Sequence, residues 1–249
     1  MAQKSKKSIP QNLHDAQVAI DNSLADPVIL SAVSEFGYNE EKLGAGRTLH
    51  GEVLQAVHQQ KAAAGAQQIA TAELKKAETE AFAAYQDLAK VARAVFADNP
   101  ANLVTLGLDQ KMPRSTGPFI VAGYKLFNNA ADLTVLAGYG YNADRLTAET
   151  AKIAAYEQAN LAQEAAKGAA QQATAAQRDA LKALNAWVAQ YRKIARVALR
   201  GNPQALEKLG IAARTSKTAA QRAAPAKAAA TRAANKAAAE EEEPETELV

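Results

Sequence analysis

The sequence predicts an all-α fold, namely an internally duplicated helical bundle with short end helices and a disordered C-terminal tail. Apolar residues recur at helical spacing along most of the 249 residues. The one run that resembles a strand, Phe119-Ile120-Val121, continues at helical spacing, so we interpret it as helix. Short motifs recur after 103 residues, and about 26 of the 73 aligned pairs that begin at Phe36 are identical. This match indicates a duplication, because frequent alanine alone would not produce it.

The repeat period sets the expected domain boundaries. We expect a disordered basic lead at 1-8, helical repeat 1 at 9-111, helical repeat 2 at 112-212 and a low-complexity tail at 213-249. Aromatic residues make up only 5% of the chain, and alanine dominates its apolar fraction. The core of each repeat is therefore expected to depend on close helix packing more than on large side chains.

Each repeat is expected to open with two short helices, followed by a turn motif that occurs in both repeats. The second helix is predicted at 27-35 in repeat 1 and at 131-137 in repeat 2. The motif Gly37-Tyr38-Asn39 returns as Gly140-Tyr141-Asn142. Its glycine can adopt the left-handed conformation that ends a helix, and its asparagine can cap the next one. We interpret both tyrosines as packing residues and not as the lining of a pocket.

The spans 39-98 and 142-201 contain no proline, so each is compatible with helix throughout. Two arrangements are possible: two long antiparallel helical arms per repeat, turning near Gly65 or Gly168, or one continuous long helix per repeat. A continuous helix of about 55 residues would be roughly 80 Å long. Small residues around both glycines are repeated identically, which favours two long helices that cross closely, and we favour the continuous helix.

A further short helix is expected to close each repeat. Asn99-Pro100 and Asn202-Pro203 are typical of a cap followed by a first-turn proline, and Gly107 and Gly210 would end these helices. Leucines at matching positions are expected to face the core: Leu103, Leu106, Leu206 and Leu209. Basic residues one turn apart end each long helix, where they would complement its dipole or, alternatively, clamp a phosphate or carboxylate: Lys90, Arg93, Lys193 and Arg196.

Several classes of chemistry are not expected. The chain has no cysteine, which removes disulfides and thiolate chemistry and fits a reducing compartment. Its histidines, His14, His50 and His58, lack metal-ligand spacing and do not recur, and we interpret His50 and His58 as partly buried helix positions. No glycine-rich phosphate loop, secretory signal or membrane span is evident. We therefore expect a soluble, cytoplasmic protein that is not an enzyme, with no cofactor, metal or small-molecule substrate.

The tail differs in composition from the rest of the chain. Its basic residues are separated by Ala, Thr, Gln and Pro, and a run of glutamates follows at 240-243. Such a segment cannot form a core and is predicted to be disordered. In composition it resembles the tails of bacterial histone-H1-like proteins and of phasins, which coat polyester granules. Six basic residues of the tail could neutralise phosphates and give salt-sensitive binding of nucleic acid or another polyanion: Arg214, Lys217, Arg222, Lys227, Arg232 and Lys236. Alternatively, the acidic end could fold back on these residues, or the tail could serve only to keep the protein in solution.

Three classes of function remain. We favour a structural or scaffolding protein whose duplicated helices associate with another copy or bind a protein partner. The first alternative is polyanion binding by the tail, because the formal charge of +3 is too small for the whole chain to suggest nucleic acid. The second is a phasin-like granule coat, which needs a continuous apolar face. Four central glutamines interrupt such a face: Gln59, Gln60, Gln67 and Gln68.

Overall fold

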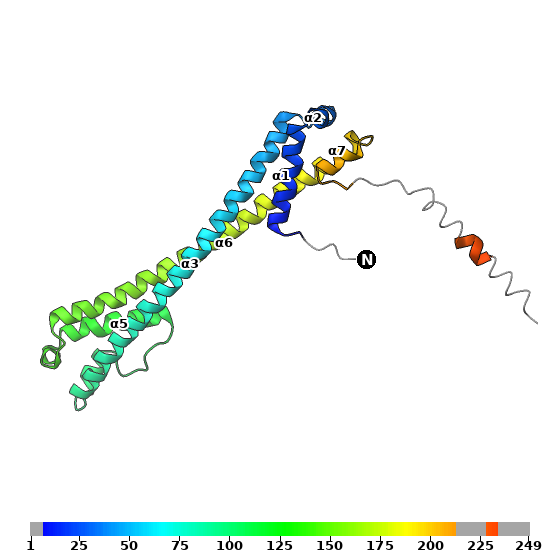
Figure 1. Cartoon of the computed structure of the whole chain (residues 1–249). Coiled ribbons are helices and arrows are strands. Elements are labelled where there is room, and N and C mark those ends of the chain that lie inside the picture. Colours follow the sequence, from blue (N-terminus) through cyan, green and yellow to red (C-terminus); the bar gives the residue numbers. More distant parts are fainter. Residues whose placement is uncertain (1–6, 213–227, 234–249) are drawn as a thin grey trace, which may run out of the picture. The chain divides into compact units, whose positions relative to one another are not determined.

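The computed structural model describes residues 7–212 and 228–233, and the regular elements of this part of the chain are all helical (Figure 1). In chain order they are α1 (Ile9–Ala25), α2 (Pro27–Ser34), α3 (Glu40–Val95), α4 (Pro100–Thr105), α5 (Thr116–Ala131), the 3-10 helix η1 (Thr134–Tyr139), α6 (Ala143–Ala198) and α7 (Pro203–Lys208). Residues 228–233 are also helical, although the whole tail at 213–249 was predicted to be disordered. The predicted all-α fold class is confirmed for these residues. No helix among them combines the length and apolarity needed to cross a membrane.

Two long helices dominate the structure. Each of α3 and α6 has 56 residues, and Figure 1 shows each as an unbroken ribbon. Neither turns at Gly65 or Gly168, so the continuous helix is found and the helical hairpin is not. Each mid-helix glycine costs about 1 kcal/mol relative to alanine, but the surrounding Ala, Gln, Glu and Lys residues favour helix strongly enough to continue through it.

The chain divides into two compact units. Unit 1 takes its described residues from Met1–Arg47 and Trp187–Val249, and unit 2 is Thr48–Ala186. Both long helices contribute residues to both units. Unit 1 is therefore assembled from two segments that are distant in sequence, whereas unit 2 is one continuous stretch.

Unit 1 has a core built from α1, α2, α7 and the ends of the two long helices. Its buried residues are Ala19, Ile29, Val33, Tyr38, Leu43, Tyr191, Ala195, Leu199, Ala205, Leu206, Leu209 and Ile211. The Ser23 and Tyr191 hydroxyls form a buried hydrogen bond that joins α1 to α6. Asp15 forms a half-buried ion pair with Arg192 at 3.4 Å, and Asp21 pairs with Arg47 at the surface at 2.6 Å. Burial of apolar surface is the main stabilising contribution to this unit, since an exposed pair such as Asp21 with Arg47 contributes little.

Unit 2 has an aromatic core. The ring of Phe82 stacks on that of Phe119 with centroids 4.0 Å apart, and Tyr85 and Tyr156 pack against the same Phe119 ring. Tyr156 donates a hydrogen bond to Thr116 at 3.1 Å. Phe119 belongs to α5, which confirms that the apolar run at 119–121 is helical.

The predicted helix ends are largely confirmed. Four glycines have positive φ, at 81° for Gly37, 71° for Gly107, 86° for Gly140 and 64° for Gly210. In each case the amide after the glycine bonds a carbonyl five residues earlier, as in Tyr38 to Val33 and Tyr141 to Leu136. Only glycine adopts this backbone conformation without a steric penalty. Leu106, Leu206 and Leu209 are buried as expected, and Leu103 is half-buried.

Two local predictions need correction. The helix expected at 131-137 is the 3-10 helix η1, and it begins at Thr134 because α5 extends through Ala131. Only the six residues of η1 remain before the turn at Gly140, and helical segments this short commonly form i to i+3 hydrogen bonds. Asn202 caps α7 by accepting from the Ala205 amide at 3.1 Å, whereas Asn99 makes no such side-chain bond at the start of α4.

Candidate functional site

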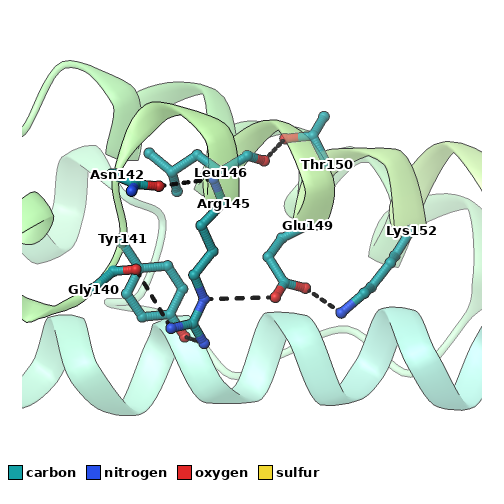
Figure 2. Close-up of polar contacts among 8 residues, drawn as sticks. All are labelled: Gly140, Tyr141, Asn142, Arg145, Leu146, Glu149, Thr150 and Lys152. Carbon is teal, nitrogen blue, oxygen red and sulfur yellow. Dashed lines mark hydrogen bonds and ion pairs between the residues drawn. The ribbon is translucent and has the colours of Figure 1, made fainter.

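The start of α6 is a closed polar corner (Figure 2). Asn142 accepts a hydrogen bond from the Arg145 amide at 2.9 Å and so caps the helix. The Arg145 guanidinium lies 4.2 Å from the centroid of the Tyr141 ring, and its Nε is 3.7 Å from Glu149. The second carboxylate oxygen of Glu149 pairs with Lys152 at 2.7 Å. Each charge in Figure 2 therefore has a partner within the corner.

The start of α3 repeats the asparagine cap and the cation over the tyrosine ring, but not the ion pairs with Glu149. Asn39 accepts from the Lys42 amide at 3.0 Å, and the Lys42 ammonium lies 4.7 Å from the Tyr38 ring centroid. Tyr38 and Tyr141 are 1% and 3% exposed, which confirms that they pack and do not line a pocket. Burial raises the pKa of both phenols, and the nearby Arg145 partly offsets this for Tyr141. The two corners are joints that fix where each long helix begins.

An aromatic cluster in unit 1 contains the only tryptophan of the sequence. Trp187 stacks on Tyr191 with centroids 5.4 Å apart, and Tyr38 packs edge-on against Trp187 at 5.8 Å. A Cβ on Gly46 would lie 2.5 Å from the indole ring, so the absence of a side chain there lets Trp187 lie against α3. The hydroxyl of Tyr38 and the indole nitrogen are buried without a hydrogen-bond partner within the described structure. The cluster contributes packing.

The central section of the long helices is the most unusual surface of unit 2. Between Ala56 and Ala81 on α3, and between Tyr156 and Leu184 on α6, no residue is buried. Neither helix carries a charge at 62–72 or at 168–177, on any side. The central section is defined here as these two uncharged segments. It covers about three turns of each helix.

A groove of about 360 Å³ lies between the two helices at this level. Its lining is Gln60, Ala64 and Gln67 from α3, and Ala170, Gln171, Thr174, Ala175 and Arg178 from α6. Further along, Tyr156 lies 3.5 Å from Glu78, so the helices run antiparallel within unit 2. Thr174 donates its hydroxyl to the Ala170 carbonyl at 2.8 Å. The groove thus offers methyl groups and neutral amides, with the Thr174 hydroxyl and the Arg178 guanidinium beside them, a mixture that suits contact with another protein surface.

Two other grooves in unit 2 have different linings. One of about 450 Å³ between α5 and α6 is mostly alanine and threonine around Phe127 and Leu146. Another, of about 270 Å³, lies beside α4 and contains Lys111, Lys125 and Asp109. In the described ranges, no group of three or more His, Asp or Glu side chains is placed to hold a metal ion.

Most of the tail residues proposed to bind polyanions cannot be placed. Arg214, Lys217, Arg222, Lys227 and Lys236 lie outside the described residues, while Arg232 lies within 228–233 and is exposed. The basic residues near the ends of the long helices are all exposed, and Lys90 pairs with Asp87 at 3.5 Å. His50 is half-buried as expected, but His58 is exposed, because it lies on the side of α3 away from α6.

Sequence reasoning missed two features of these sites. Each tyrosine directly precedes a capping asparagine, and the cation stacked on it follows in the first turn of the helix, a position that lets it contact the residue before the cap, so the signal was present. The contact of Gly46 with Trp187 joins residues far apart in the chain, and no local pattern indicates it.

No protein-family model matches this chain, and neither a curated protein nor a solved structure matches it significantly.

Proposed function

We propose that the protein is a non-enzymatic structural or scaffolding protein that acts through contacts of its helices with a second copy or with a protein partner. One observation carries the proposal: the central section has neither buried side chains nor charges. A solvent-facing helix surface normally carries charged residues, whereas depletion of charge is typical of the centre of a protein–protein interface.

The proposal is tested by the mass of the full chain in solution. We expect sedimentation equilibrium to show a multiple of the 26.2 kDa chain mass, with a proportion that rises with protein concentration. A partner chain captured by cross-linking would support the second form of the proposal only if its cross-links fall on the central section. A strictly monomeric chain without such cross-links would overturn both forms.

We also propose that the two halves of the chain arose by duplication. The matched joints support this, since Gly37 and Gly140 share a left-handed φ and each is followed by a buried tyrosine and a capping asparagine. If the joints are equivalent, Gly37→Ala and Gly140→Ala each lower the free energy of unfolding by about 1–2 kcal/mol. Gly138→Ala is the control, because Gly138 has an ordinary φ and open space around it. Clearly unequal costs at the two joints would count against equivalence.

Polyanion binding by the tail is a second candidate function. It is supported by the basic residues between Arg214 and Lys236, among which no acidic residue occurs. We expect the full chain to retard nucleic acid in a low-salt shift assay, and the retardation to disappear as salt is raised. Deletion of 213–249 should abolish it. Unchanged retardation after the deletion would exclude the tail as the binding element.

A further inference from the structure

One side of α3 faces away from α6 and is largely apolar and exposed. Its residues follow one another by three or four positions, the spacing of a single helix face. We define the α3 outer face as Leu54, His58, Ala62, Gly65, Ile69 and Ala72. Ile69 is 67% exposed and Leu54 is 42% exposed. At 3.6 residues per turn, this face points nearly opposite to Gln60, Ala64 and Gln67, which line the groove toward α6.

We propose that the α3 outer face binds the same face of a second copy of this chain, with the two α3 helices antiparallel about a two-fold axis between Gly65 and Ala66. The inference rests on the proposed scaffold function and deepens it by naming the partner and the surface. A two-fold interface uses one patch twice, so the patch must be complementary to itself.

The residues of the α3 outer face meet that requirement in size. With the axis between Gly65 and Ala66, Ile69 lies level with Ala62 of the second copy, and Ala62 lies level with Ile69. The largest exposed side chain of the face is thus placed on one of its smallest. Gly65 lies at the centre, where the absence of a side chain lets the two backbones approach closely.

The polar groups beside the face are also compatible in this register, because no like charges lie level with one another. His58 lies level with Glu73 of the second copy, and Gln55 lies level with Lys76 on the same side of the interface. Lys61 lies level with Ala70, so no like charges are opposed. A helix of different sequence would not in general present these pairs, whereas an identical helix related by a two-fold axis forms each of them twice.

The matching side of α6 is a poorer candidate. There Gln172 takes the position that Ile69 has on α3, and Leu161 takes that of His58. The glycine is kept as Gly168, and an added Cβ would meet open space at both Gly65 and Gly168. Gly168 therefore provides a matched control for experiments at Gly65.

Disulfide cross-linking tests the arrangement directly, since the natural chain contains no cysteine. In the full chain, Gly65→Cys should form under mild oxidation a species of twice 26.2 kDa, and Gly168→Cys should form at least about tenfold less. Ala72→Cys separates the two orientations, because residue 72 meets residue 72 of another copy only in a parallel pair. Cross-linking of Ala72→Cys at the rate of Gly65→Cys would overturn the antiparallel arrangement.

Affinity measurements test the α3 outer face without the introduction of cysteine. Ile69→Glu should raise the dimer dissociation constant at least about tenfold, equal to about 1.4 kcal/mol. Val121→Glu, at an equally exposed valine on α5, should leave it unchanged. His58→Glu and Glu73→Lys should each weaken the dimer, and the double variant should restore it. Circular dichroism confirms that each variant stays helical.

The outcomes separate this inference from the proposed function. If the chain self-associates but Gly65→Cys does not cross-link and Ile69→Glu has no effect, the α3 outer face is wrong and the scaffold proposal stands. If the chain is monomeric at every concentration, the inference is overturned, and the scaffold proposal then depends on a different partner.

Discussion

At the scale of single residues, Gly46 has the strictest steric environment among the glycines of the long helices. The Trp187 ring occupies the space that any side chain at this position would need. Local sequence signals identified Gly37 and Gly140 because a turn motif surrounds them. Gly46 has no such motif, and its role depends on a residue from the other long helix. Sequence reasoning therefore finds residues that serve local backbone geometry and misses those that serve distant packing.

Gly46→Ala is predicted to destabilise unit 1. Displacing the indole should cost about 1–3 kcal/mol, which exceeds the gain of up to about 1 kcal/mol from replacing a helical glycine. Gly51→Ala, five positions further along α3 in open space, should stabilise the protein instead. Denaturant unfolding followed by the fluorescence of Trp187, the only tryptophan, measures both effects. A stabilising Gly46→Ala would contradict the packing described here.

Tyr191 is predicted to make the stability of unit 1 depend on alkaline pH. Burial raises the pKa of this phenol above its ordinary value of 10.0, the hydrogen bond with Ser23 lowers it in part, and nearby Tyr38 raises it further. The unfolded chain therefore loses its proton first as the pH rises. The stability due to Tyr191 is intact below pH 10 and declines as the pH rises from 10 toward the folded pKa.

The test is denaturant unfolding at several pH values above and below 10. Tyr191→Phe should reduce the alkaline loss of stability, because it removes the ionisable hydroxyl. An identical pH dependence in the variant and the natural protein would show that Tyr191 does not contribute.

At the scale of elements, the absence of proline left both a hairpin and a continuous helix possible, and the repeated small residues around Gly65 and Gly168 favoured the continuous helix that is found. The periodic pattern located α5 and the helix starts, because those depend on residues within a few turns of each other. It did not predict that α5 would extend through Ala131 and shorten the next element to η1. It also did not predict that His58 would be exposed, since that depends on which side of α3 faces α6.

Hydrogen exchange is predicted to vary along each long helix. Amides within 62–72 have no buried side chains around them, whereas those near Leu88 and Ala92 lie in the aromatic core of unit 2. At concentrations where the protein is monomeric, the first group should exchange faster by local opening. Mass spectrometry of exchanged peptides measures this. Uniform protection along α3 in the monomer would contradict it.

At the scale of the whole molecule, the repeat period and the compact units give different divisions of the chain. The period follows the order of residues and predicts neighbours along the sequence. Compactness follows contacts such as Ser23 with Tyr191, which join residues from the beginning and the end of the described chain. A sequence pattern repeated in tandem carries no information on which distant segments pack together. The segments that make up each unit could therefore be identified only from the structure.

The discontinuity of unit 1 has a consequence for how the protein is made. About 140 residues separate Arg47 from Trp187, so at 5–20 residues per second a ribosome needs roughly 7 to 28 s to supply the second part of this unit after the first. The delayed folding of unit 1 is tested by protease digestion of ribosome-bound chains that end either before Trp187 or after Ile211. Protection of α1 and α2 in the shorter chains would contradict the delay. Until the second part of the unit is synthesised, the core lacks Tyr191 and Leu206. The residues that pack with them from the first part, Ile29, Val33 and Tyr38, are then uncovered. The growing chain therefore passes through a period in which apolar residues of its first helices are uncovered and open to aggregation.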